Sequence, residues 1–190
     1  MSAAAAPARL PPIAIYLAPG DYAVGDARHR IRTLLGSCVS ITLWQPSRQL
    51  GAMSHFLLAE RGPGRSSPAG ELDARYGAEA LTLMLRDLAA RGVSPHDCEA
   101  KLFGGGNMFP GQARDTPLRV GQRNGDAARA MLEAEGIRVV SYSLFGSGHR
   151  KIMFDIATGH VWSRQQPIGS AAPPLAQPSD GEQLPQGGSA

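Results

Sequence analysis

Two stretches of the chain place their hydrophobic residues at the spacing of an amphipathic helix. The first covers residues 75–91 and is followed by Gly92, which is suited to a C-terminal cap. Its apolar face consists of Tyr76, Ala80, Met84 and Leu88, with Leu81 and Leu85 beside them. The second covers about residues 125–135, between Asn124 as N-terminal cap and Gly136 as C-terminal cap. Its apolar face consists of Ala127, Ala128, Met131 and Leu132.

Shorter apolar runs, several of which alternate with polar residues, predict β-strands. These runs cover residues 13–17, 39–44, 52–58, 100–103, 137–142, 150–156 and 160–164. The last two are expected to form a hairpin around Ala157, Thr158 and Gly159. Because several hairpins accompany two helices, the pattern predicts an α+β fold with both helices packed on one face of a mainly antiparallel sheet.

The two ends of the chain differ in composition from the part between them. Residues 1–12 are rich in Ala and Pro, and residues 165–190 are rich in Pro, Gly, Ser and Gln. Neither segment has enough apolar residues to offset the entropy lost on ordering, so both are predicted to be disordered tails. One folded domain is expected between them, at residues 13–164.

Composition and charge narrow the class of protein. A chain of 190 residues, 43% of them hydrophobic, is long enough for one domain with a substantial core. No apolar run approaches the roughly 18 residues that span a bilayer, and the N-terminal segment lacks the features of a secretory signal. We therefore expect a cytoplasmic protein with no stable membrane insertion. The net charge is +3, but no basic run is interleaved with aromatic residues, so nucleic acid is not an expected partner.

Two cysteines, Cys38 and Cys98, are the candidate nucleophiles. Cytosolic thiols are mostly reduced, so each is considered as a free thiol. Cys98 lies between a helix end and a short strand, where a buried structural thiol is expected. Cys38 follows Gly36 and Ser37, whose small side chains let backbone N–H groups approach the sulfur and hold a developing oxyanion. A buried thiol that begins a core strand is the alternative for Cys38.

The candidate base is His55. If residues 39–44 and 52–58 form a hairpin centred on Pro46 and Ser47, His55 lies directly across from Cys38. Directly opposed residues have Cβ atoms about 5 Å apart, so thiol and imidazole could reach hydrogen-bonding distance. A longer loop would move this register, and a core histidine bound to a backbone carbonyl is the alternative. The convergence of a cysteine and a histidine on one hairpin favours nucleophilic catalysis.

The sequence shows few features of a metal-binding or nucleotide-binding site. It has no Cys-x-x-Cys pair, and the histidines other than His55 are scattered along the chain. The run Gly104, Gly105 and Gly106 lacks the Gly-Lys-Ser/Thr that follows in a phosphate-binding loop. We therefore expect no metal and no cofactor, and we interpret the glycine run as a tight turn bordering a cleft.

Seven segments, in order along the chain, closely resemble successive motifs of the CheD family. They are TLLGSCVSITLW, GAMSHFLL, RYGAEAL, AKLFGGGNMF, VGQRN, EGI and RKIMFDIATG, and they extend from about Tyr16 to Trp162. CheD proteins are chemoreceptor glutamine deamidases. The resemblance implies an α/β/β layered sandwich, related in architecture to the deamidating domain of cytotoxic necrotizing factors. It makes residues 13–164 a CheD-like deamidase domain.

The resemblance also implies roles for single residues. The family cysteine lies in the LGSC motif and corresponds to Cys38, and the family histidine corresponds to His55. The third catalytic member is a threonine shortly before the cysteine, which would orient the imidazole. Thr33 is the nearest candidate, and a one-residue shift would place Arg32 there instead.

The implied reaction converts glutamine side chains of chemoreceptor cytoplasmic domains (methyl-accepting chemotaxis proteins) to glutamate, releasing ammonia through a thioester on the cysteine. His149, in the segment GSGHRK, is expected at the surface rather than at the substrate rim. Backbone donors for the oxyanion are expected around Ser37 and Cys38 or in the loop formed by Gly104, Gly105, Gly106 and Asn107.

Two other functions stay open. CheD relatives pair with the CheC phosphatase, so the chain could instead be a non-catalytic chemotaxis partner that modulates a CheC-type phosphatase. A general cysteine peptidase is the third possibility. A pocket sized for a primary amide would not support cleavage of a peptide bond.

Overall fold

The computed structural model describes residues 11–62, 70–108 and 117–167 of the protein. These residues form nine strands, two α-helices and one 3₁₀ turn. In chain order the elements are β1 (Ile13–Tyr16), β2 (Tyr22–Gly25), β3 (His29–Leu35), β4 (Val39–Gln45), β5 (Leu50–Ser54), α1 (Gly77–Ala89), η2 (Pro95–Asp97), β6 (Glu99–Gly104), α2 (Pro117–Ala134), β7 (Arg138–Leu144), β8 (His149–Asp155) and β9 (His160–Gln166).

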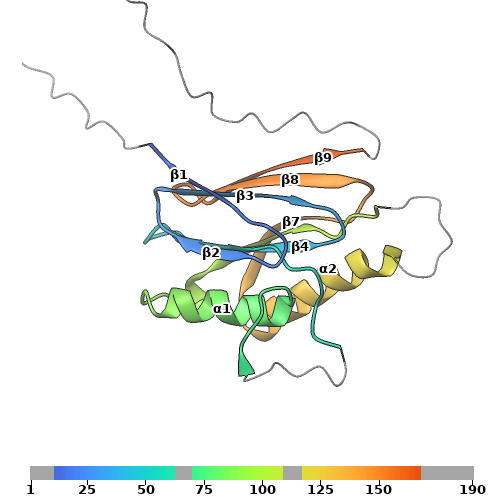
Figure 1. The fold of residues 1–190 in the computed structure, drawn as a ribbon. Coiled ribbons are helices and arrows are strands. Elements are labelled where there is room, and N and C mark those ends of the chain that lie inside the picture. Colours follow the sequence, from blue (N-terminus) through green and yellow to red (C-terminus); the bar gives the residue numbers. More distant parts are fainter. Residues whose placement is uncertain (1–10, 63–69, 109–116, 168–190) are drawn as a thin grey trace, which may run out of the picture.

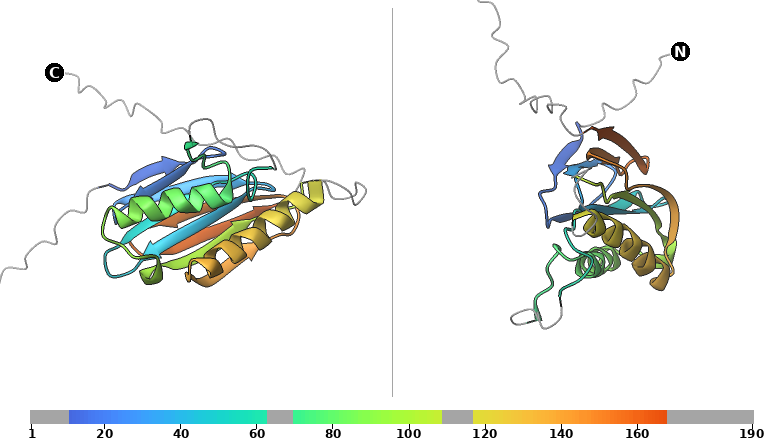
Figure 2. Two further views of the ribbon diagram at one scale, coloured as in Figure 1. Left: turned by 90° about the horizontal axis from the view of Figure 1, so that it is seen from below. Right: turned by 90° about the vertical axis from the view of Figure 1, so that its right-hand side faces the viewer.

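The strands make two sheets, and the helices cover one of them (Figure 1). The outer sheet has the strand order β1-β3-β8-β9, and the middle sheet has the order β2-β5-β4-β6-β7. Neighbouring strands are antiparallel except β1 with β3 and β6 with β7. Figure 2 shows α1 and α2 side by side across the middle sheet. The expected α+β class and the α/β/β layering are thus confirmed.

Two hydrophobic cores lie on the two faces of the middle sheet. Successive side chains of a strand point to opposite faces, so β4, at the centre of this sheet, contributes to both cores. Val39, Ile41 and Leu43 point toward the helices. The core between the sheets is built from Leu17, Ile31, Leu35, Met53, Phe103, Ile152, Phe154 and Ile156. Polar side chains on the inner faces of these strands are therefore enclosed between the sheets.

The predicted start of the second helix is wrong, while the first helix and both glycine caps are confirmed. Gly92 and Gly136 follow the helices with φ of 75° and 67°. The second helix begins at Pro117 rather than near Gly125, so Asn124 lies inside it instead of capping it. Glycine normally weakens a helix interior, which hid the preceding turns in the sequence pattern.

Two strands of the structure were not predicted. In β3, charged residues interrupt the apolar pattern of the sequence. Ile31, Thr33 and Leu35 are buried, while Arg30 and Arg32 are exposed on the other face. β2 has only four residues and ends in a glycine. The hairpin of β8 and β9 around residues 157–159 is confirmed.

The predicted tails lie mostly outside the described residues. β9 takes in Gln165 and Gln166, which had been assigned to the C-terminal tail. Across residues 11–62, 70–108 and 117–167, neither helix is long and apolar enough to cross a membrane.

Candidate active site

Thr33, Cys38 and His55 converge between the two sheets, where the chain passes from β3 to β4. Thr33 points inward with its neighbours Ile31 and Leu35. Cys38 packs against the same core, immediately before β4. His55 follows the last residue of β5 and is 2% exposed. The sequence therefore predicted three residues that the fold brings to one place.

The predicted register of the β4–β5 hairpin is wrong. Thr42 pairs with Met53, and Val39 is bridged to Phe56, so His55 lies opposite Ser40 rather than Cys38. The connection is a loop of residues 46–49 instead of a two-residue turn. This loop is stabilised by the Arg48 N–H, which donates to the Gln45 side chain at 2.6 Å. Cys38 and His55 are diagonal neighbours on one face of the hairpin.

The Thr33 hydroxyl determines which nitrogen of His55 carries the proton. Thr33 Oγ1 donates its single hydrogen to the Leu17 carbonyl at 2.7 Å. Its contact of 2.8 Å with His55 Nδ1 must therefore be a bond that Nδ1–H donates to Oγ1. Nε2 is left unprotonated, buried and without a hydrogen-bond partner. Arg32, the alternative third residue, is exposed on the opposite face of β3.

Burial keeps both members of the candidate pair neutral. It lowers the pKa of His55, and the Leu17 carbonyl and Asp21 oppose this effect. Burial also raises the pKa of the half-buried Cys38 thiol, while the residue's own backbone N–H opposes it. At neutral pH the site therefore holds a neutral thiol and a neutral imidazole, and Nε2 is not hydrogen-bonded to the thiol in this structure.

Cys98 has the character expected of a structural thiol. It is 3% exposed and packs in the core between the helices and the middle sheet. Burial raises its pKa to about 11. Cys98 is therefore a poor nucleophile at neutral pH.

The glycine loop supports the Cys38 segment through its own amides. Gly105 N–H donates to the Cys38 carbonyl and Gly106 N–H to the Gly36 carbonyl, both at 2.8 Å. Asn107 N–H donates to the Gly146 carbonyl at 2.7 Å. The backbone N–H groups of Gly105, Gly106 and Asn107 are therefore bonded to carbonyls of the protein itself. Within the described ranges, the N–H groups of Ser37 and Cys38 donate to no carbonyl of the backbone, and that of Cys38 faces its own thiol.

Asn124 is a supporting residue that sequence reasoning assigned to another role. Its side-chain Nδ2 donates to the Leu57 carbonyl at 2.7 Å and to the Ser37 carbonyl at 3.3 Å. It thereby ties α2 to the segments that follow β5 and precede β4. The VGQRN motif contained this signal, because a buried asparagine needs partners for its amide.

Arg150 is a second support that was missed. Its buried guanidinium donates to the carbonyls of Gly104 and Phe145, each at 2.9 Å. The neighbouring His149 is exposed, as expected. In the described ranges, no three His, Cys, Asp or Glu side chains gather as metal ligands would.

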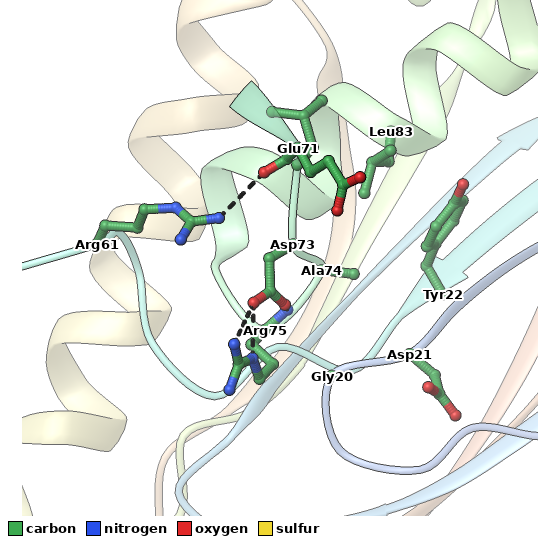
Figure 3. Close-up of a pocket in the computed structure, with 10 residues that line it drawn as sticks. Gly20, Asp21, Tyr22, Arg61, Glu71, Asp73, Ala74, Arg75 and Leu83 are labelled. Atoms are coloured by element: carbon green, nitrogen blue, oxygen red, sulfur yellow. Dashed lines mark hydrogen bonds and ion pairs between the residues drawn. The ribbon is translucent and has the colours of Figure 1, made fainter. Parts of the chain in front are cut away.

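A polar cavity of about 640 Å³ opens beside the start of α1 (Figure 3). Arg75 lines it and donates to Asp73 at 2.7 Å, and Arg61 pairs with Glu79. Thr33, Cys38 and His55 do not line this cavity. Two backbone hydrogen bonds link its lining to the site: Gly20 N–H donates to the His55 carbonyl at 2.7 Å, and His55 N–H donates to the Asp21 carbonyl at 2.9 Å.

The chain shares its sequence with a described family over more than half of its length. The family model for CheD chemotactic sensory transduction matches residues 57–165. The curated "Probable chemoreceptor glutamine deamidase CheD 2" of Albidiferax ferrireducens is 59% identical over 160 residues, which are 84% of this chain and 91% of that protein. The chain belongs to the CheD family. That match omits only 30 of the 190 residues, so it spans Thr33, Cys38 and His55 wherever it begins.

Two further proteins similar to this CheD-family chain share less of its sequence. The "Probable chemoreceptor glutamine deamidase CheD 1" of Chromobacterium violaceum is 43% identical over 152 residues, covering 80% of this chain and 77% of that protein. Among solved structures, the protein YfiH of Bacillus licheniformis is similar over 67% of this chain and 55% of its own, with 15% identity and a TM-score of 0.41. A similarity that low supports no statement about function.

Proposed function

We propose that this chain hydrolyses glutamine side chains on the cytoplasmic domains of chemoreceptors, with Cys38 as nucleophile, His55 as base and Thr33 as positioning residue. The substrate class follows the names of the curated relatives. One observation carries the chemistry: the hydrogen bonds from Nδ1 to Thr33 and on to the Leu17 carbonyl leave Nε2 unprotonated beside the Cys38 segment. A substrate on the cytoplasmic domain of a receptor implies that the protein acts in the cytoplasm.

The first half of the reaction forms a thioester. Nε2 of His55 accepts the thiol proton while Sγ of Cys38 attacks the Cδ carbon of the glutamine amide. The N–H groups of Ser37 and Cys38 are the donors available to the oxyanion, since those of the glycine loop are occupied. The imidazolium then gives its proton to the amide nitrogen, and ammonia leaves.

The second half of the reaction releases the product. A water molecule gives a proton to Nε2 and attacks the thioester carbon, the C–S bond breaks, and the sulfur recovers its proton from the imidazolium. The glutamine has become glutamate, and the enzyme returns to its neutral pair. Throughout, Thr33 keeps the ring in one orientation because Nδ1–H stays bonded to Oγ1. No step calls for a metal ion or an organic cofactor.

Mass spectrometry of a chemoreceptor cytoplasmic fragment tests the proposal. The fragment is incubated with the wild-type chain, with Cys38→Ala and with Cys98→Ala as the matched control. We expect a gain of about one mass unit per site with ammonia release for the wild type and the control, and none for Cys38→Ala. A gain with Cys38→Ala would overturn the role of this cysteine.

A negative result with the wild type has a separate meaning. If several receptor fragments stay unchanged, the enzymatic proposal fails for those substrates. Binding to a CheC-type phosphatase by both the wild type and Cys38→Ala would then replace it with the non-catalytic role.

A further inference from the structure

Ser40 has a hydroxyl that is buried and has no partner. Its side chain is 0% exposed, and Oγ contacts no hydrogen-bonding atom. His55 Nε2 is likewise buried and has no hydrogen-bond partner. Leaving a buried polar atom unpaired costs about 1–3 kcal/mol, so two such atoms near each other require a common explanation.

The register of the middle sheet places these two residues opposite each other. Val39 and Phe56 exchange both backbone hydrogen bonds, at 3.1 and 3.0 Å, so the adjacent pair of Ser40 and His55 is the closer, non-hydrogen-bonded type. Ser40 also pairs with Phe103, whose side chain belongs to the core between the sheets. Ser40 and His55 therefore share one face of the hairpin.

The two groups are chemically complementary in both states of the imidazole. Thr33 holds the proton of His55 on Nδ1, so the neutral ring offers a lone pair at Nε2 that a hydroxyl can donate to. After Nε2 has taken a proton, the same hydroxyl oxygen can accept from it. In the structure the two atoms are not bonded, and a rotation about the Ser40 Cβ–Oγ bond is what turns the hydroxyl from donor to acceptor.

We infer that Ser40 is a positioning residue for the imidazole of His55, whose Nε2–H bonds to the Ser40 hydroxyl once Nε2 has taken up a proton. This role rests on the proposed function, in which Nε2 gains and loses a proton twice in each cycle. Ser40 supports the imidazolium at Nε2, as Thr33 supports it at Nδ1.

Ser54 is a matched control in the same hairpin. It is also fully buried and precedes His55 directly, but it lies on the helix-facing side of the strand. Its Oγ accepts from the Ile41 N–H at 3.3 Å. Ser54→Ala therefore removes a buried hydroxyl of equal size without touching the face that carries the imidazole.

The experiment is an NMR titration of the His55 ring in the full chain, with Cys38→Ala as background so that the thiol does not compete. Hydrogen bonds to a charged group are the stronger ones, so Ser40→Ala should lower the pKa of His55 by about half a unit or more. Ser40→Thr should restore the pKa, and Ser54→Ala should leave it unchanged. An unchanged pKa in Ser40→Ala, or an equal shift in Ser54→Ala, would overturn the inference.

This measurement needs no turnover, so its failure is distinct from a failure to deamidate. If Ser40→Ala does not fold, Ser40→Cys keeps the volume and replaces the hydroxyl by a weaker partner, with the same direction of shift expected. In the chain with Cys38 intact, the acidic limb of kcat/KM for ammonia release should move in Ser40→Ala as the titration does. A limb that stays in place would overturn a role in catalysis.

Discussion

At the scale of single residues, Thr33 has one hydrogen to give and two polar neighbours. Because it gives that hydrogen to the Leu17 carbonyl, its oxygen can only accept from His55. In the proposed mechanism, this hydroxyl orients the imidazole and takes no part in bond making. Valine has the shape of threonine but lacks the hydroxyl, so Thr33→Val tests the hydrogen bond to His55.

Thr33→Val should lower kcat/KM for ammonia release by roughly 10- to 100-fold, because the imidazole loses the acceptor worth about 1–3 kcal/mol that fixes its tautomer. Thr33→Ser keeps the oxygen and should stay within a few-fold of the wild type. Initial rates with a receptor fragment measure both variants. A wild-type rate for Thr33→Val would contradict the orienting role.

The pH dependence of the reaction follows from the two buried groups. The pKa of His55 is lowered from 6.5 and that of Cys38 is raised from 9.0, in both cases mainly by burial. The neutral pair therefore exists over a wider interval than these ordinary values span. We expect kcat/KM to be flat from about pH 7 to 8, to fall on the acidic side as His55 is protonated, and to fall on the alkaline side as Cys38 ionises. An acidic limb above pH 7 would contradict this ordering.

The sequence allowed the candidate reactive residues to be predicted, but not the residues that support them. Cys38 and His55 are of reactive types, and Thr33 was named through a family resemblance. Ser40 and Asn124 are common polar residues whose importance comes from being buried against a specific partner. That partner is set by register and by packing between distant elements, which a local pattern does not contain.

At the scale of elements, α2 approaches the middle sheet closely because it carries glycine where it meets the glycine loop. A Cβ at Gly121 would lie 2.5 Å from the Gly105 carbonyl oxygen, and a Cβ at Gly125 would lie 2.6 Å from the ring of Phe145. The contact sets the depth of the helix, and with it the reach of Asn124 to the Ser37 carbonyl.

Gly121→Ala should lower the free energy of unfolding by about 1–3 kcal/mol, since backbone atoms on both sides would have to move. The direction is informative, because the same change in an exposed helix stabilises it by about 1 kcal/mol. Denaturant titration measures the difference. Gly62→Ala, where the added Cβ meets nothing within 4 Å, is the control and should be neutral.

Elements with a regular apolar pattern were predicted well. Elements whose bounds or register depend on contacts with distant residues were not. The apolar stripe of α1 is strictly periodic, and its predicted face is buried. In β3 the exposed arginines obscure the alternation, and the β4–β5 loop was predicted too short because Pro46 and Ser47 alone suffice for a turn. The resulting error of register placed His55 opposite Cys38, whereas the structure places it opposite Ser40.

At the scale of the whole molecule, Arg150 joins the two sheets near Cys38. It lies on β8 of the outer sheet and donates to the carbonyl of Gly104, the last residue of β6 in the middle sheet. The same guanidinium also bonds to the Phe145 carbonyl in the turn before β8. The planar guanidinium has several N–H donors in fixed directions and can bond to both carbonyls at once. A lysine ammonium lacks this fixed geometry.

Arg150→Lys should lower the free energy of unfolding by about 2–4 kcal/mol, because buried carbonyls lose charge-assisted partners. The same change at the exposed Arg32 should stay within about 0.5 kcal/mol. Urea titrations of the two variants give the comparison. Equal stabilities would show that the guanidinium does not hold the sheets together.

The order of strands also determines when, during synthesis, the sheet that carries Thr33 can be completed. β3, which carries Thr33, lies between β1 and β8 in the outer sheet, and β8 covers His149–Asp155 near the end of the described chain. A nascent chain that has emerged only as far as β7 holds both Cys38 and His55, yet its outer sheet lacks two of four strands. In the proposed mechanism, Thr33 fixes the base that activates Cys38, so we expect full reactivity of this cysteine only after β8 and β9 have completed the outer sheet.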